Sequence, residues 1–174
     1  EDENNEFLKF IKKYGIIPSV GHSNETYNNI SNLIKNGLKS VTHTYNAQKG
    51  IHHREVGVVG ASLLFDELYT ELICDGIHVS KEAVKLLVKN KPIDKIVLIT
   101  DSLSVKGLED GIYQEIDQII YMKNHEPRLI DGTLAGSTLK INKAIKNLID
   151  FTNISFSDAI KCATENPAKL LNIF

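Results

Sequence analysis

Four short apolar segments alternate with segments of helical spacing, and this alternation constrains the fold more than any other feature. The predicted strands cover residues 16–20, 38–42, 68–74 and 95–100. The predicted helices cover residues 4–14, 24–36, 81–90, 137–151 and 155–164. Strands that alternate with helices in this way favour a parallel sheet built of right-handed βα units. The sequence therefore predicts an α/β fold with about four βα units.

Several residues mark where the predicted helices begin. Ser23 or Asn24 is expected to cap the second helix, and Ser80 is expected to cap the helix over 81–90. The pair Asn166 and Pro167 indicates a further helical turn. The first helix places four large apolar residues at helical spacing, namely Phe7, Phe10, Ile11 and Tyr14.

Residues 105–133 do not follow the helix–strand pattern. Glycines punctuate this stretch, and Ile116, Ile119 and Tyr121 stand among polar residues with the spacing of strands. We therefore expect a hairpin or lid here rather than another βα unit.

Composition excludes several classes of protein. The 174 residues are 42% hydrophobic and 24% charged, with a formal net charge of -2, so the charge of a general nucleic-acid binder is missing. No run approaches the roughly 20 apolar residues that cross a bilayer. The acidic N-terminus lacks the pattern of a signal peptide. Two cysteines are too few for a disulfide framework or a four-thiolate zinc site. We expect a cytoplasmic protein with no nucleic-acid or membrane partner.

Four polar residues follow the four predicted strands. His22, His43, His78 and Asp101 each stand just beyond a strand's C-terminal end. Such ends converge on one face of a parallel sheet or barrel, and ligands bind there. A single histidine after a strand more often serves a loop or a cap, but four coincidences favour a shared site. Imidazoles and carboxylates hold zinc or iron(II), so the pattern points to a metal-dependent hydrolase.

Seven short motifs occur in one order along the chain. They are GHSN at 21–24, THTYNA at 42–47, HREVG at 53–57, DGIHV at 75–79, TDS at 100–102, DGTLAGS at 131–137 and ATENPA at 163–168. Together they resemble the N-acetylglucosamine-6-phosphate deacetylase family of the amidohydrolase superfamily. The resemblance extends from about residue 14 to residue 171.

This resemblance implies roles for the residues after the strands. His22 and His43 match two metal ligands, and the metal would be zinc or iron, with one or two ions in the full enzyme. Asp101 matches the carboxylate that takes a proton from the attacking water and passes it to the leaving amine. Further residues match positions that contact the phosphosugar substrate, namely Asn46, Ala47, Arg54, Asp75, Gly76, Ile77, His78, Leu134, Ala135 and Gly136.

The family's barrel has eight strands, and this sequence matches the C-terminal half of it. We therefore expect residues 1–174 to form about four βα units of a TIM-like (β/α)8 barrel, with the lid inserted at 105–133. The N-terminal half-barrel, the β-sandwich, a His-x-His pair and an upstream glutamate have no counterpart here. Two imidazoles hold zinc weakly, and a half-barrel leaves open strand edges. We expect the isolated chain to be inactive, or to need its other half or a second copy.

Three functions remain open from the sequence. The resemblance favours an amidase that removes acetate from an amino-sugar phosphate, acting as a homodimer. Another amidohydrolase, such as a dihydroorotase-like cyclic amidase, is an alternative, although Arg54 and the Asn46–Ala47 pair favour the phosphosugar. A non-catalytic half-barrel that only associates is the third. Two residues depart from the family, because Val56 replaces a proline and Gln48 a methionine.

Overall fold

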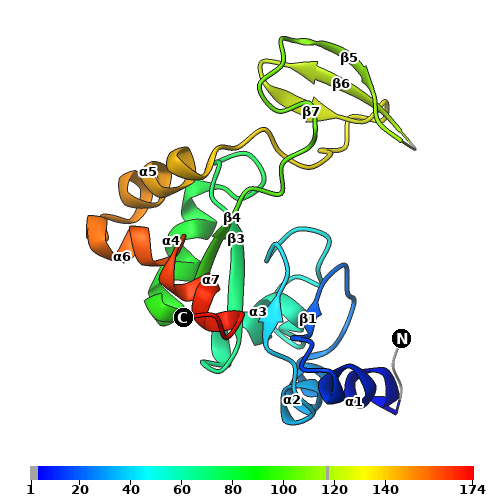
Figure 1. The fold of residues 1–174 in the computed structure, drawn as a ribbon, viewed down its shortest axis with the longest axis vertical. Coiled ribbons are helices and arrows are strands. Elements are labelled where there is room, and N and C mark those ends of the chain that lie inside the picture. Colours follow the sequence, from blue (N-terminus) through cyan, green and yellow to red (C-terminus); the bar gives the residue numbers. More distant parts are fainter. Residues whose placement is uncertain (1–3, 117) are drawn as a thin grey trace.

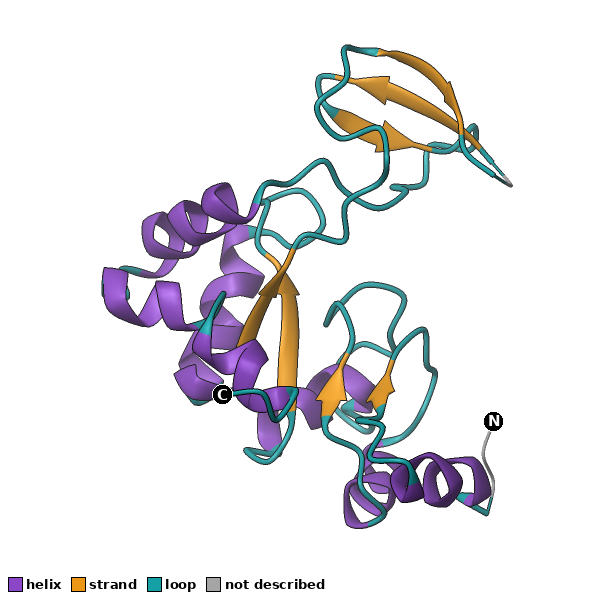
Figure 2. Ribbon diagram, in the orientation of Figure 1, coloured by secondary structure: helices purple, strands orange, loops and turns teal. Residues whose placement is uncertain are grey.

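The computed structural model describes residues 4–116 and 118–174, and its centre is a parallel sheet. The four strands are β1 (Ser19–Val20), β2 (Ser40–Val41), β3 (Tyr69–Ile73) and β4 (Ile96–Ile99). They are hydrogen-bonded in the order β1-β2-β3-β4, every neighbour is parallel, and the order along the sheet follows the order along the chain. The predicted parallel α/β sheet is confirmed. Figure 2 shows all four arrowheads pointing toward the same side of the molecule.

Helices connect successive strands and cover the sheet. They are α1 (Glu6–Lys13), α2 (Tyr27–Lys35), α3 (Gly57–Leu64), α4 (Lys81–Asn90), a 3-10 turn (Ile93–Lys95), α5 (Ile141–Thr152), α6 (Phe156–Lys161) and α7 (Glu165–Leu170). The helices from α4 to α7 gather beside β3 and β4, whereas α1 and α2 lie near β1 (Figure 1). Among the described residues, no helix combines the length and the apolar content that crossing a bilayer requires.

The capping signals are partly confirmed. Ser80 caps α4, because its hydroxyl oxygen accepts a hydrogen bond from the Ala83 N–H. The prediction for α2 is wrong by two or three residues, since Thr26 is the cap and accepts from the Asn29 N–H. Ser23 instead accepts from the Glu25 N–H in the turn before the helix.

Several element boundaries differ from the predicted ones. The strand expected over 16–20 shortens to β1, because Pro18 has no N–H to give to a ladder. The helix expected from residue 137 begins at Ile141, because Ser137 pairs with Ser102 beyond the end of β4. Hydrogen bonds on both sides of Ser137 hold this pairing, from its own N–H to the Asp101 carbonyl (2.7 Å) and from the Leu103 N–H to its carbonyl (2.9 Å).

Sequence periodicity does not reveal α3. Seven of its eight residues are buried, so the helix has no polar face that could produce an amphipathic pattern. Its first residue, Gly57, has φ +61°, and a Cβ there would lie 2.6 Å from the Lys49 carbonyl oxygen. Only glycine fits this close approach.

The packed core is divided between the two halves of the sheet. The larger cluster joins β3 and β4 to α4, α5 and α6 around Leu72, Leu87 and Leu148. A smaller cluster joins β2 to α2 and α3 around Ile30 and Val41. Helix α1 turns only Leu8 and Ile11 inward, whereas three of its predicted apolar residues are exposed, namely Phe7, Phe10 and Tyr14.

The stretch expected to be a hairpin or lid folds as a separate antiparallel sheet of three strands. They are β5 (Gly111–Gln114), β6 (Ile119–Lys123) and β7 (Glu126–Arg128). Ile120 and Met122 are buried at the centre of its own small core. This sheet stands beyond the C-terminal ends of β3 and β4 (Figure 2).

Candidate active site

The turns that end three of the strands share an unusual backbone conformation. His22, His43 and Asp101 have φ values of 48°, 31° and 48°, in the left-handed region. Histidine and aspartate enter this region more readily than most residues, and strained backbone of this kind gathers at functional sites. Each of the three residues stands two positions beyond the C-terminal end of its strand, and because the strands are parallel all three lie at the same edge of the sheet.

The two histidines lie next to each other. The centroids of the His22 and His43 rings are 4.8 Å apart, with the ring planes inclined at 66°. His43 is buried, and its Nδ1 atom has no hydrogen-bond partner within residues 4–116 and 118–174. A buried polar atom without a partner is costly, so this nitrogen is available to a ligand. The structure thus brings together the two imidazoles that the sequence assigns to a metal.

The described residues do not by themselves complete a metal centre. Nowhere in 4–116 or 118–174 do three histidine, cysteine, aspartate or glutamate side chains converge on one point. A catalytic zinc ion normally has three protein ligands and one open position. Two adjacent imidazoles are therefore a partial site, and any further ligand has to come from elsewhere.

Asp75 and His78 form a short buried pair after β3. The Asp75 Oδ2 atom lies 2.6 Å from His78 Nδ1, and both side chains are more than 90% buried. Burial acts to raise the pKa of Asp75, but hydrogen bonds from the His78 ring and from the Ile77 and His78 N–H groups outweigh it and lower that pKa.

An ionised carboxylate can only accept, so His78 carries its proton on Nδ1. The other ring nitrogen, Nε2, is buried and has no hydrogen-bond partner in the part of the chain that the structure describes. The pair therefore holds a fixed ring whose free nitrogen can meet a bound molecule.

A cavity of about 580 Å³ opens between the β3 turn and the antiparallel sheet. Asp75, Ile77 and His78 line it from one side, and Leu134 lines it from the other. These are four of the ten predicted substrate-contacting residues, and they come from two segments far apart in the sequence. Gly76 lies in the same turn with φ +82°, where its missing side chain leaves room for Phe151. The volume lies in the range of small-molecule sites.

Asp101 is closely packed against the loop that precedes α5. A Cβ on Gly136, which has φ +46°, would lie 3.0 Å from the Asp101 carbonyl oxygen. Glycine is therefore required at this point of the DGTLAGS motif. Its neighbour Ala135 turns its methyl group into the core of the antiparallel sheet and donates its N–H to the Pro127 carbonyl (3.1 Å).

Glu71 is a site residue that the sequence analysis missed. It lies on β3, where burial raises the pKa of its carboxyl group. The backbone N–H of His43 opposes that rise by donating a hydrogen bond, and the nearby Asp101 charge adds to it. Glu71 thus stands between two predicted active-site residues. The available signal was a single acidic residue inside the apolar stretch 68–74.

The predicted phosphate-binding residues lie in the loop after β2, and the structure does not bring Arg54 into the cavity. Asn46 donates its backbone N–H to the His43 carbonyl (3.0 Å), and Ala47 has φ +49°. Arg54 is exposed at the tip of a tight turn closed by two backbone hydrogen bonds between His52 and Glu55. Its guanidinium group contacts the ring of the adjacent His53 at 2.7 Å.

Glu55 anchors this turn although Val56 replaces the family's proline. Its carboxylate accepts from the Tyr27 and Gly57 N–H groups, both at 2.9 Å, at the starts of α2 and α3. These two hydrogen bonds lower the pKa of Glu55. Gln48, the other departure, donates to the Thr42 carbonyl at 2.9 Å. Glu55 thus holds the turn that precedes Val56, whereas the Oε1 atom of Gln48 is buried without a hydrogen-bond partner among the described residues.

The sequence from residue 5 to residue 174 matches the Amidohydrolase family. The chain belongs to this family. An N-acetylglucosamine-6-phosphate deacetylase of Bacillus subtilis is 42% identical over 174 residues, which are 100% of this chain and 44% of that protein. An N-acetylgalactosamine-6-phosphate deacetylase of Escherichia coli O157:H7 is 34% identical over 166 residues, which are 95% of this chain and 44% of that protein.

A solved structure shows the same arrangement. The crystal structure of N-acetylglucosamine-6-phosphate deacetylase from Thermotoga maritima matches with a TM-score of 0.93 and 44% identity, over 98% of this chain and 47% of that one. This amidohydrolase chain therefore has the fold of part of a deacetylase barrel, as predicted. It spans less than half the length of the relatives that it matches.

Proposed function

We propose that this chain supplies one half of the active site of an N-acetylglucosamine-6-phosphate deacetylase. The observation that carries the proposal is the placement of His22, His43, His78 and Asp101 at the C-terminal ends of four successive parallel strands. Relatives named as deacetylases of amino-sugar phosphates support the assignment of the reaction.

The proposed reaction hydrolyses the acetamido group of the sugar. Asp101 takes a proton from the attacking water, whose oxygen bonds to the amide carbon. The carbon–nitrogen bond then breaks, and Asp101 returns the proton to the leaving nitrogen. Acetate and the free amine result, and one water is consumed. His78 contributes Nε2 to hold a polar group of the substrate, while Asp75 fixes its ring.

His22 and His43 are proposed as two ligands of a divalent zinc or iron ion, and the remaining ligand would lie outside the described residues. Arg54 is proposed to bind the phosphate group, since a planar guanidinium makes paired hydrogen bonds with phosphate oxygens. Because Arg54 contacts His53 and does not line the cavity, we propose that it acts at the site of a second copy in a homodimer.

A substrate panel tests this function. The chain is joined to the part of the Bacillus subtilis relative that lies outside the matched stretch, and the isolated 174-residue chain is assayed beside it. We expect the joined protein to release acetate from N-acetylglucosamine 6-phosphate and the isolated chain to release none. N-acetylgalactosamine 6-phosphate is included because a relative is named for it.

Other outcomes of the panel would contradict the proposal. Ring opening of dihydroorotate without acetate release would identify a different amidohydrolase. A joined protein that binds zinc but turns over no substrate would favour a half-barrel that only associates. Sedimentation of the joined protein tests the homodimer, and a monomer with full activity would exclude the proposed role of Arg54.

A further inference from the structure

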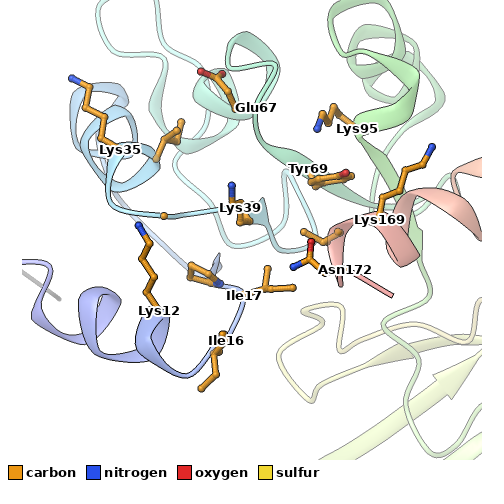
Figure 3. A pocket seen from close by; sticks show the side chains of 15 residues that line it. Lys12, Ile16, Ile17, Lys35, Lys39, Glu67, Tyr69, Lys95, Lys169 and Asn172 are labelled. Carbon is orange, nitrogen blue, oxygen red and sulfur yellow. The ribbon is translucent and has the colours of Figure 1, made fainter. Parts of the chain in front are cut away.

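The opposite end of the parallel sheet carries a second cavity of about 580 Å³, at the N-terminal ends of the strands (Figure 3). Its walls come from the ends of α1 and α2, the turns before β1 and β2, the starts of β3 and β4, and the end of α7 with the chain after it. Five of the lining residues are lysines, namely Lys12, Lys35, Lys39, Lys95 and Lys169. None of them belongs to the proposed active site.

The positive charge of this basic cavity is poorly balanced. Among the described residues, Glu67 is the only acidic one that lines it, although the chain as a whole has a net charge of -2. Lys169 reaches Glu165 at 3.4 Å. The ion pairs found in the described part of the chain do not include the other four, namely Lys12, Lys35, Lys39 and Lys95. Ammonium groups crowded in one concave site repel one another, and the site attracts anions.

Separate elements supply the four unpaired lysines, and contacts position two of them, Lys12 and Lys95. The stem of Lys12 passes close to the backbone at Gly37, where an added Cβ would lie 3.6 Å from its Cδ. The Lys95 ammonium group sits over the Tyr69 ring, 4.3 Å from its centroid. In Figure 3 the Lys39 side chain lies between these two. Contacts of this kind reduce the freedom that a lysine would lose on binding an anion.

The basic cavity also has apolar lining residues, which together make up its apolar wall. They come from three segments and are Ile16, Ile17 and Pro18 before β1, Ile34 of α2 and Leu170 of α7. A simple inorganic ion would leave this surface in contact with water. A ligand with both an anionic group and an organic body would cover the wall and meet the lysines at the same time.

We propose that this basic cavity binds a small organic diphosphate. Four unpaired ammonium groups match the charge of a diphosphate better than that of a single phosphate, and the apolar wall accommodates the organic part. The proposal is independent of the proposed deacetylase reaction, because it uses the other end of the sheet and none of the same residues.

Calorimetric titration of the full 174-residue chain with ADP and with inorganic pyrophosphate tests the proposal. We expect both to bind, ADP more tightly than pyrophosphate because only ADP reaches the apolar wall. Lys39→Glu should weaken binding of both at least tenfold. The matched control is Lys85→Glu, which makes the same charge change at an exposed lysine of α4 outside the cavity, and it should leave binding unchanged.

Three results would overturn the proposal. They are no binding of either probe at millimolar concentration, equal weakening by Lys39→Glu and Lys85→Glu, and tighter binding of pyrophosphate than of ADP. Thermal melting of each variant accompanies the titration, and a second variant, Lys95→Gln, removes charge without reversing it. If Lys39→Glu does not fold, a threefold or greater loss of affinity in Lys95→Gln supports the site, and unchanged affinity overturns it.

Discussion

The two halves of the parallel sheet are built differently. Strands β3 and β4 have five and four residues and pack on the larger core, whereas β1 and β2 have two residues each and pack on the smaller one. The β3–β4 half carries Asp75, His78 and Asp101, and the β1–β2 half carries the two neighbouring imidazoles. The group proposed to move the proton and the Asp75–His78 pair therefore stand on the better-packed half, whereas the proposed metal ligands and the phosphate-binding Arg54 stand on the other one.

Lys91 links the halves. It follows α4 on one side, and its ammonium group donates to the carbonyl of Phe65, at the end of α3 on the other (2.6 Å). Burial lowers the pKa of Lys91 to about 8. The contact between Lys91 and the Phe65 carbonyl thus forms part of the boundary between the two cores, called the seam below.

The largest expected effect is the loss of unfolding free energy when one buried leucine in each core is replaced by alanine. Leu72→Ala removes a fully buried side chain from the larger cluster and should cost about 3–5 kcal/mol of unfolding free energy. Leu38→Ala opens a cavity in the smaller cluster, which can collapse more easily, and should cost about 2–3 kcal/mol. Urea unfolding measures both. A larger cost for Leu38→Ala would reverse the ranking of the two halves.

The next effect is a dependence of folding stability on pH, which arises from Lys91 at the seam. Lys91 loses its proton near pH 8 when folded but near its ordinary value of 10.5 when unfolded. Between these values the unfolded chain binds more protons, so stability rises with pH. Compared with Lys91→Met, the wild type should gain about 1–3 kcal/mol between pH 7 and pH 10. A difference between the two proteins that does not change with pH would show that Lys91 is not buried at the seam.

The smallest expected effect is the loss of stability when either of two helix-capping side chains is removed. Thr26→Ala and Ser80→Ala each remove one side-chain acceptor, from the Asn29 N–H and the Ala83 N–H respectively. Each should cost about 1 kcal/mol. Amide exchange distinguishes the halves, because the loss at Thr26 should appear as faster exchange confined to α2, whereas the loss at Ser80 should appear across the larger core. Identical exchange patterns would argue for a single cooperative unit.

The sequence predicts well those elements whose signals are local. Helix α4 has an amphipathic face and a serine cap, and it begins where the pattern says. The order of strands also follows from the alternation of apolar and helical segments. Helix α3 was missed because nearly every side chain in it is buried, which removes the contrast that periodicity needs. The third strand of the inserted sheet depends on pairing with β6 rather than on its own composition.

The same division applies to the site. Residues that follow strands could be predicted because parallel strands end together. The Asp75–His78 contact and the Glu71 carboxylate could not, since both depend on how side chains pack after the chain folds. The position of Arg54 depends on the turn closed by His52 and Glu55, and the orientation of that turn cannot be predicted from a sequence motif.

The central claim is tested most directly by measuring acetate release by the joined protein and by its Asp101→Asn variant. Asp101→Asn keeps the size of the side chain but removes the base, and we predict a loss of about 10²–10⁴-fold in kcat with little change in KM. The matched control is Asp94→Asn at an exposed position of the 3-10 turn, which should retain full activity. An Asp101→Asn enzyme that keeps wild-type kcat would contradict the account, because the proton would then be transferred by another group.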